Sequence, residues 1–300
     1  MSNSNNISVA MATFNGESFL REQMDSILNQ TIDFKEIIIC DDKSTDNTWH
    51  ILQEYAAKDN RIKIFQNDSN IGLVKNFENA ILKCSGDLIA LSDQDDIWLP
   101  KHLEILMNGL GEKDIAMGDA EIINGAGQRL NMTLSYCECR DFTPDNDLEK
   151  AYSLFFYRGW FQGASMLIRK SFFNIALPIP NFKIYHDYWF GCLACFCNGV
   201  NYIPEVITLY RRHDQAVTGK KKRSSKIKTQ IGHILTNKVF KERPLLIDSI
   251  IERRGYNLTS EQMDFLKVAK IYFDRRKTLI GRIKNSFFEI KNYKLIYSEK

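Results

Sequence analysis

The stretch Leu88-Ile89-Ala90-Leu91-Ser92-Asp93-Gln94-Asp95-Asp96 decides the fold, because a short apolar run leads directly into three carboxylates. The apolar run predicts a buried β-strand over residues 88–91 that ends in a polar turn. Three aspartates within four positions repel one another unless a cation or hydrogen bonds compensate their charge. Carboxylate oxygens suit Mg²⁺ or Mn²⁺, which take one or two protein carboxylates together with phosphate oxygens. An acidic turn that caps a helix is the alternative.

The residues before this stretch repeat the pattern of an apolar strand followed by polar residues. Predicted strands lie at residues 7–12, 35–40 and 62–66, and predicted helices at 17–30, 46–58 and 75–84. The alternation of strands and helices indicates a mainly parallel sheet covered by helices. In such sheets ligands bind beyond the carboxyl ends of the strands. Polar clusters stand at these ends, at residues 13–17, 41–42 and 93–96.

The pattern after the first hundred residues is less regular. We predict a strand at residues 164–168, a helix at 185–199, and strand-like pieces at 203 and 206–210. After Gly219 the pattern changes to basic, amphipathic helices. We therefore expect one α/β domain over residues 1–219 and a basic helical region over residues 220–300.

Composition places the chain among ordinary globular proteins, with 300 residues, 44% hydrophobic and 26% charged. No segment approaches the roughly 20 consecutive apolar residues of a membrane-spanning helix. The start, residues 1–6, is polar and lacks the basic and apolar parts of a signal peptide, so we expect a cytosolic protein. The seven cysteines include Cys137 and Cys139, and three more in the apolar run 192–197. Their spacing favours buried free thiols over a zinc site.

The formal net charge of +3 is unevenly spread along the chain. Residues 220–300 hold 21 Lys and Arg against 8 Asp and Glu, whereas residues 1–219 hold 19 against 29. A solvated helical surface explains such a tail, and so does attraction to a membrane surface, lipid phosphates or nucleic acid. The tail lacks a known nucleic-acid-binding motif and interleaved aromatic residues, which argues against nucleic acid.

Several motifs over residues 7–100 resemble glycosyltransferase family 2, in one order and with matching spacing. They are Ser-Val-Ala-Met-Ala-Thr-Phe-Asn-Gly at 8–16, Cys-Asp-Asp-Lys-Ser-Thr-Asp at 40–46, Asn-Ile-Gly at 70–72, Ser-Gly-Asp at 85–87 and Asp-Gln-Asp-Asp at 93–96. The last is similar to the family's DXD motif, and weaker resemblance continues to about residue 219. The resemblance implies a GT-A fold and a glycosyltransferase that depends on Mn²⁺ or Mg²⁺.

The resemblance also implies roles for single residues at the nucleotide-sugar. Ala12 and Phe14 would line the base pocket, and Asp42 would accept a hydrogen bond from a pyrimidine base. Asp93 would contact the ribose or the metal region, and Asp95 would ligate the metal that bridges the diphosphate. Lys75 would also approach the nucleotide. For Phe14 a core aromatic is the alternative, and for Lys75 a solvated helix charge.

The segment Tyr185-His186-Asp187-Tyr188-Trp189 resembles the family's segment around its catalytic base. An acceptor hydroxyl must lose a proton as it attacks the anomeric carbon, and a positioned carboxylate can take that proton. The resemblance makes Asp187 the base and His186 a neighbour that orients it. The alternative role of Asp187 is to cap the following helix. Residues 160–164 resemble the glycine-containing loop that receives the acceptor sugar.

The segment Tyr210-Arg211-Arg212-His213-Asp214 resembles an Arg-x-His segment of bacterial rhamnosyl- and hexosyltransferases of this family. The resemblance implies that Arg211 and Arg212 pair with phosphate oxygens, a contact that suits guanidinium groups. It also implies that His213 reaches the metal or the departing diphosphate. A surface loop at the start of the basic tail is the alternative.

The resemblance implies inverting transfer of a hexose such as glucose, galactose or rhamnose from a UDP- or dTDP-sugar. The acceptor would be a saccharide on a polyprenyl diphosphate, in the biosynthesis of bacterial surface polysaccharide such as O-antigen or capsule. The basic tail would hold the enzyme, as a peripheral protein, at the inner face of the cell membrane. A non-catalytic sugar-nucleotide-binding protein and a nucleotidyltransferase-like protein stay open as alternatives. The Gly-x-Gly-x-x-Gly motif of dinucleotide oxidoreductases is absent after the first strand.

Overall fold

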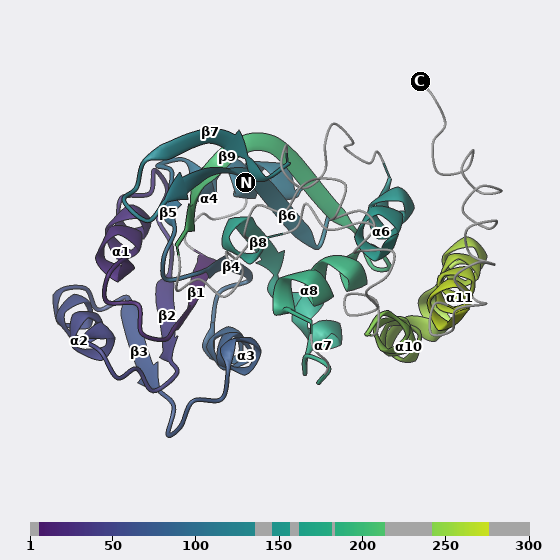
Figure 1. The fold of residues 1–300 in the computed structure, drawn as a ribbon, viewed down its shortest axis with the longest axis horizontal. Coiled ribbons are helices and arrows are strands. Elements are labelled where there is room, and N and C mark those ends of the chain that lie inside the picture. The colour runs from purple at the N-terminus through teal and green to yellow at the C-terminus, as the bar shows by residue number, and fades with distance from the viewer. Residues whose placement is uncertain (1–5, 136–145, 157–161, 182–183, 214–241, 276–300) are drawn as a thin grey trace, which may run out of the picture. The chain divides into compact units, whose positions relative to one another are not determined.

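The structure is a computed structural model that describes residues 6–135, 146–156, 162–181, 184–213 and 242–275 (Figure 1). The chain divides into two compact units. The first comprises Met1–Ile179 with Tyr185–Lys220, and the second comprises Pro180–Ile184 with Lys221–Lys300. Every residue that the sequence assigns to the site lies in the first unit.

The described residues of the first unit form a mixed sheet of nine strands, eight of them in the order β3-β2-β1-β4-β8-β6-β9-β5. The first four strands are parallel to one another, as the sequence predicts. They are β1 (Ile7–Thr13), β2 (Glu36–Asp41), β3 (Ile62–Gln66) and β4 (Leu88–Ser92). Each begins and ends within two residues of its predicted bounds. The predicted α/β architecture of this region is confirmed.

The second half of the sheet adds the strands that the sequence predicted less well. They are β5 (Ile97–Trp98), β6 (Ile115–Asn124), β7 (Arg129–Thr133), β8 (Met166–Arg169) and β9 (Val200–Arg212). Strand β8 is antiparallel to both β4 and β6, and β9 is parallel to β6. Strand β9 is continuous where the sequence predicted two pieces. Its register against β6 shifts on either side of Asp119, and Pro204 interrupts the apolar pattern. The sequence pattern of a single strand is therefore interrupted within β9.

Helices cover both faces of the parallel strands. Alternate residues of β1 and β2, such as Val9 and Ile37, join one apolar cluster with side chains of α1 (Leu20–Leu28), α2 (Thr48–Lys58) and α4 (His102–Leu110). The intervening residues point to the other face, where α3 (Leu73–Lys83) packs on β1 and β2. The remaining α-helices that the structure describes in full in this unit are α6 (Asp147–Phe156), α7 (Phe173–Ala176) and α8 (His186–Ala194). The sequence did not predict α4 or α6.

The described part of the second unit is a pair of helices, α10 (Arg243–Arg254) and α11 (Ser260–Arg275), that pack against each other. Residues 242–275 carry six Lys and Arg and six Asp and Glu, so this pair is electrically balanced. The positive charge of the tail is in residues 220–241 and 276–300, outside the described residues. Among the helices that the structure describes, none has the length and apolar character to cross a membrane.

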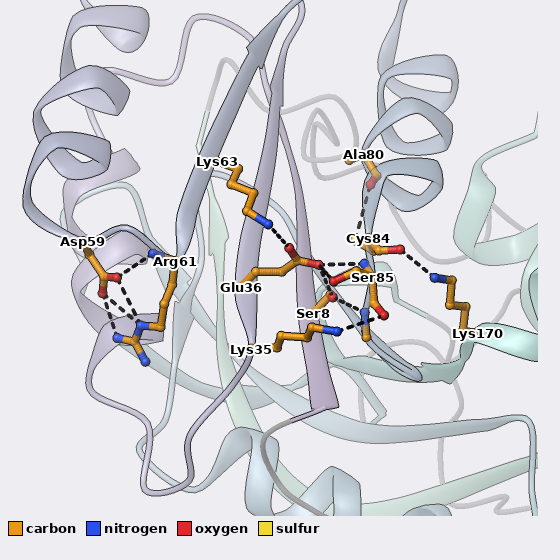
Figure 2. A network of polar contacts seen from close by, with 11 residues as sticks. Ser8, Lys35, Glu36, Asp59, Arg61, Lys63, Ala80, Cys84, Ser85 and Lys170 are labelled. Atoms are coloured by element: carbon orange, nitrogen blue, oxygen red, sulfur yellow. Dashed lines mark hydrogen bonds and ion pairs between the residues drawn. The ribbon is translucent and has the colours of Figure 1, made fainter.

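A buried carboxylate ties together the amino ends of three parallel strands (Figure 2). Glu36 at the start of β2 is 1% exposed and accepts hydrogen bonds from Ser8 Oγ at 2.8 Å and from Ser85 N at 2.6 Å. Lys63 Nζ on β3 lies 2.7 Å from its other oxygen. Burial by itself would raise the pKa of Glu36, but the bonds from Lys63, Ser85 and Ser8 outweigh it and hold the pKa at about 2.

The low pKa of Glu36 makes the stability of the fold depend on pH. A carboxylate whose pKa is lowered in the folded state stabilises the fold above its unfolded pKa, and this contribution disappears as the pH falls toward 2. We expect Glu36→Gln to lower the free energy of unfolding by about 2–3 kcal/mol at pH 7. Urea denaturation should show a smaller difference between variant and wild type at pH 3.

Glu54→Gln is the matched control, because Glu54 pairs with Arg21 at 2.7 Å on the exposed faces of α1 and α2. Exposed ion pairs contribute little to stability, so this variant should unfold like the wild type. Equal loss in both variants, or a Glu36→Gln difference that is constant from pH 7 to pH 3, would contradict the role of the buried network.

Candidate active site

The strand register brings the predicted polar clusters to one edge of the sheet. Thr13 of β1 pairs with Asp41 of β2, and Met11 of β1 pairs with Ser92 of β4. The residues that follow these strands, from Phe14, Asp42 and Asp93 onward, therefore leave the sheet side by side. This edge is the carboxyl end of the parallel strands, where such sheets bind ligands.

The two aspartates after β2 have different partners. Asp41 is fully buried and accepts hydrogen bonds from Thr13 Oγ1 at 3.0 Å and from Gln66 Nε2 at 2.9 Å. Asp42 is 2% exposed and accepts hydrogen bonds from Ile71 N and Gly72 N, both at 2.8 Å, and from Asn67 Nδ2 at 2.9 Å. Asp42 therefore holds the loop over residues 67–72 against the end of β2. Its predicted contact with a base stays a prediction.

Asparagines that the sequence analysis missed complete this wall of the site. Asn76 is 1% exposed on α3, and its Nδ2 donates to Cys40 O at 2.7 Å. Asn67 Nδ2 donates to Asn76 Oδ1 at 2.9 Å and also to Asp42. No local pattern distinguishes Asn76 from an exposed helix residue. Only its position against the backbone of β2 reveals this role.

The other predicted nucleotide-binding residues differ in exposure. Ala12 is 4% exposed within β1, whereas Phe14 is 43% exposed directly after it. Lys75 lies on α3 with its Nζ 2.9 Å from Glu78 Oε1, and its side chain is 47% exposed. Phe14 and Lys75 are thus accessible to a ligand, and Ala12 contributes at most an edge of its side chain.

Residues 93–96, here called the acidic turn, follow β4 and lie within electrostatic reach of Asp187. Burial and the neighbouring charges of Asp95 and Asp187 raise the pKa of Asp93 to about 8. Burial, Asp95 and Asp93 raise the pKa of Asp96 well above its ordinary value. The structure therefore gathers at one place carboxylates from the turn and from α8, which are about ninety residues apart in the chain.

Asp187 stands in the first turn of α8, and both of its oxygens accept backbone hydrogen bonds. Oδ2 accepts from Gly163 N at 3.2 Å, and Oδ1 accepts from Tyr188 N at 2.6 Å. Burial raises the pKa of this carboxyl, and His186 and the bond from Gly163 N partly oppose the rise. A buried carboxylate that is held in place and has a raised pKa is suited to accept a proton.

His186 differs from the prediction that it orients Asp187 directly. It is 3% exposed and stacks on Phe77, with ring centroids 4.0 Å apart. Neither ring nitrogen has a hydrogen-bond partner among the described residues. Burial lowers the pKa of His186, so the ring is neutral near pH 7. The ring therefore makes no hydrogen bond to Asp187, although its proximity lowers the pKa of that carboxyl.

Gly163 leaves the space for this packing. A Cβ at residue 163 would lie 3.0 Å from His186 Nε2 and 3.5 Å from Asp187 Cβ. Residues 160 and 161 of the predicted acceptor loop lie outside the described residues.

Strand β9 brings two further predicted residues to the acidic turn. His213 Nε2 lies 2.8 Å from Asp95 Oδ2. Arg211 is 2% exposed, and its backbone N–H donates to Asp96 Oδ1 at 2.9 Å while its Nε donates to Asp95 O at 2.8 Å. The guanidinium also pairs with Glu22. These contacts place Arg211 against the acidic turn and α1, and its predicted contact with phosphate oxygens stays a prediction.

Arg212 is half-buried and pairs in register with Asn124 of β6. Because side chains alternate along a strand, Arg212 points away from the face that Arg211 occupies. This alternation is a sequence signal that could have separated the roles of the two arginines.

The residues around the acidic turn suit a divalent cation. No group of three or more His, Cys, Asp and Glu side chains within the described residues is arranged to hold a metal ion by itself. Mg²⁺ and Mn²⁺ need only one or two protein carboxylates when phosphate oxygens supply the rest. Asp95 and His213 form such a partial set. Asp96 Oδ2 is buried and has no hydrogen-bond partner among the described residues, so this oxygen is free to accept a proton or a cation.

The five cysteines in the described residues are free thiols, and Cys197 among them is half-buried. Cys40, Cys84, Cys192 and Cys195 are buried free thiols. Burial raises the pKa of Cys40 to about 11 and that of Cys84 to about 12. Cys137 and Cys139 lie outside the described residues.

Comparison with known proteins identifies relatives of the first unit. Residues 8–173 match the family described as glycosyl transferase family 2. The Escherichia coli protein WfgD, named UDP-Glc:alpha-D-GlcNAc-diphosphoundecaprenol beta-1,3-glucosyltransferase, is 34% identical over 39% of this chain and 47% of its own length. The chain spans between about a third and about two thirds of the length of five curated relatives that it matches.

Solved structures share the fold at low sequence identity. TarS 1–349 from S. aureus in complex with UDP-GlcNAc superposes with a TM-score of 0.62 and 18% identity, over 90% of this chain and 72% of that chain. The mannosyltransferase PcManGT from Pyrobaculum calidifontis in complex with GDP-Man and Mn²⁺ has a TM-score of 0.54 and 12% identity, over 95% and 87% of the two chains. These likenesses concern the arrangement of the sheet and its helices, and they confirm the predicted GT-A fold.

Proposed function

The chain belongs to glycosyl transferase family 2, and from this premise we propose that it transfers a hexose with inversion from a UDP- or dTDP-sugar to a saccharide acceptor. The observation that carries the proposal is that Asp187 lies within electrostatic reach of the acidic turn. A base for the acceptor and carboxylates suited to a cation at the diphosphate are thus side by side.

The proposed reaction is a single displacement at the anomeric carbon. The acceptor oxygen forms a bond to this carbon while the bond to the diphosphate oxygen breaks, and the acceptor proton moves to the carboxylate of Asp187. Gly163 N–H and Tyr188 N–H hold that carboxylate in position. The anomeric configuration inverts in one step, and no covalent sugar–enzyme intermediate is needed.

At the donor side, Phe14 offers an exposed aromatic face for the base, and Asp42 and Lys75 are the further candidates there. Asp95 and His213 would hold Mn²⁺ or Mg²⁺, with Asp93 beside them. The ion would supply positive charge that stabilises the departing diphosphate. Arg211 and Arg212 remain our candidates for phosphate contact, and Arg211 is the one of them that lies against the acidic turn.

The donor and the metal requirement can be tested together by thermal shift. We expect UDP or dTDP to raise the melting temperature in the presence of Mn²⁺ and to have little effect without it, because a ligand that binds only the folded state stabilises it. GDP and ADP serve as controls. Stabilisation by every nucleotide alike, or by none, would remove the proposed donor class. Release of UDP or dTDP from the matching sugar nucleotide, in the presence of an acceptor, then measures transfer.

We further propose that residues 1–219 form the transferase domain and that residues 220–300 bind the anionic inner leaflet of the cell membrane. The name of WfgD includes a diphosphoundecaprenol-linked sugar, and such an acceptor is held at a membrane. A lipid-linked acceptor of O-antigen or capsule biosynthesis is therefore the acceptor that we propose. The segment 220–241 carries eight Lys and Arg and no Asp or Glu.

Replacing Lys220, Lys221, Lys222 and Arg223 with Gln in the full chain should weaken membrane binding. Each basic residue near an anionic surface contributes about 1 kcal/mol, so binding to phosphatidylglycerol vesicles should fall about a hundredfold or more at low salt. Sedimentation with vesicles measures this, and neutral phosphatidylcholine vesicles are the control. Equal binding of both proteins to the anionic vesicles would remove the idea.

A further inference from the structure

Gln94 lies between Asp93 and Asp95, but its hydrogen bonds go to the loop after β1. Its Oε1 accepts a hydrogen bond from Phe14 N at 2.8 Å, and its Nε2 donates to Phe14 O at 2.9 Å. The amide thus binds both polar groups of one backbone residue, as a neighbouring strand would. The residue whose aromatic ring is offered to the base is therefore tied to the acidic turn.

Gly16 makes room for this contact. A Cβ on Gly16 would lie 2.3 Å from Gln94 Oε1, 2.4 Å from its Cδ and 3.0 Å from its Nε2. These are the three nearest atoms, and all of them belong to Gln94. Its φ lies outside the left-handed region, so the backbone at this position accepts alanine without strain. The cost of a side chain at residue 16 therefore comes from displacing Gln94.

The other side of the same loop is held by the residues after β2. Asn15 N donates to Ser44 Oγ at 2.9 Å, and Asn15 Oδ1 accepts from Thr45 N at 2.8 Å. Gly16 N donates to Thr48 Oγ1 at 2.7 Å. With these bonds intact, the loop stays folded when Gln94 is changed. What Gln94 adds is the position of the loop relative to the acidic turn.

We propose that Gln94 is a positioning residue that sets the distance between the base-binding side of the site, at Phe14, and the cation-binding side, at Asp93 and Asp95. A nucleoside diphosphate spans these two sides, so the position of the Gln94 side chain affects how well both ends of the donor fit. Gln94 itself touches neither the donor nor the acceptor. The proposal rests on the proposed function for the identity of the ligand, whereas the contact between Gln94, Phe14 and Gly16 does not depend on it.

A double-mutant cycle tests the proposal, with binding of UDP in saturating Mn²⁺ measured by calorimetry. Gln94→Ala removes two hydrogen bonds, and we expect about tenfold weaker binding of UDP. Gly16→Ala should weaken binding to a similar extent, because it pushes Gln94 away from Phe14. In the Gln94→Ala background, Gly16→Ala should have no further effect, because the atoms that its Cβ would meet are gone.

Gln30→Ala is the matched control. Gln30 makes the same kind of double contact, with Oε1 accepting from Leu103 N at 3.0 Å and Nε2 donating to Leu99 O at 2.9 Å, beyond the far end of α1. It should lower the melting temperature without changing the affinity for UDP, whereas Gln94→Ala should change the affinity with a small shift in melting. Unchanged affinity for UDP in Gln94→Ala overturns the proposal. Additive effects of Gln94→Ala and Gly16→Ala on the affinity for UDP also overturn it.

Failure of the proposed function is distinguishable from failure of this inference. If the wild type binds neither UDP nor dTDP, the proposed donor is wrong. The melting temperatures of the wild type, the two single variants and the double variant are then measured in Mn²⁺ alone. Non-additive shifts support the coupling through Gln94, and additive shifts overturn it.

Discussion

Asp187→Asn should lower turnover by about 10²–10⁴-fold while the protein still binds UDP. The amide cannot take the acceptor proton, but it keeps the size of the carboxyl at the start of α8. Because burial raises the pKa of Asp187, the acidic limb of the wild-type rate profile should lie above the range of an ordinary aspartate. The base must be deprotonated, so the rate rises with pH through that limb, and the limb should be absent in the variant. Steady-state kinetics across pH, with calorimetry of UDP binding, measures both.

Asp114→Asn controls for the general effect of removing a buried carboxylate. Asp114 is 3% exposed and accepts hydrogen bonds from Asn198 N at 2.8 Å and from Asn198 Nδ2 at 3.0 Å. It directly precedes β6, whereas Asn124, which pairs with Arg212, is at the other end of that strand. This variant should melt at a lower temperature but keep the turnover number of the folded enzyme. Near-normal turnover in Asp187→Asn would place the base on another residue.

Asp95→Ala should remove Mn²⁺-dependent binding of UDP and reduce transfer below detection. Asp95 contributes to the raised pKa of both Asp93 and Asp96, so its charge is unfavourable to its neighbours in the absence of a cation. The variant without ligand should therefore melt at the same temperature as the wild type or slightly higher. Its backbone carbonyl, which accepts from Arg211, is unaffected. Thermal shift with and without Mn²⁺ and UDP separates loss of binding from loss of folding.

The exposed Asp33, before β2 and at the amino end of the strands, provides the control for Asp95. Asp33→Ala should keep the full shift of melting temperature by Mn²⁺ and UDP. Retained Mn²⁺-dependent transfer in Asp95→Ala would show that the acidic turn is not the cation site. A fall of several degrees in the melting temperature of the variant alone would instead make Asp95 a structural residue.

The positions of the first four strands followed from local pattern. Each is a short apolar run closed by polar residues, and the run at 88–91 becomes β4 with one added residue. The pattern failed at β6 and β9. Strand β6 continues into Asp119 and Glu121, and β9 contains Pro204 and Glu205, so neither is a clean apolar run. Pairing across a register shift stabilises these strands, and that pairing is not visible in either segment alone.

Some roles of site residues could likewise be predicted from the sequence, and others could not. Residue type indicated that the aspartates at 93–96 suit a cation, because oxygen chemistry is a property of the side chain. Residue type could not indicate that Arg211 is engaged with Asp95, Asp96 and Glu22, or that Gln94 binds the backbone of Phe14. Both depend on which groups lie within about 3 Å, and the partners come from different strands and turns.

The sequence by itself determined the order of strands and helices in the first hundred residues and the chemical character of the acidic turn. Local periodicity and side-chain chemistry suffice for both. Only the tertiary structure decided that Asp187 and His213 join that turn, because they are distant in the chain and reach it through α8 and β9. Burial then determines how these carboxylates hold their protons, since the free energy of a charge depends on the surroundings that folding creates.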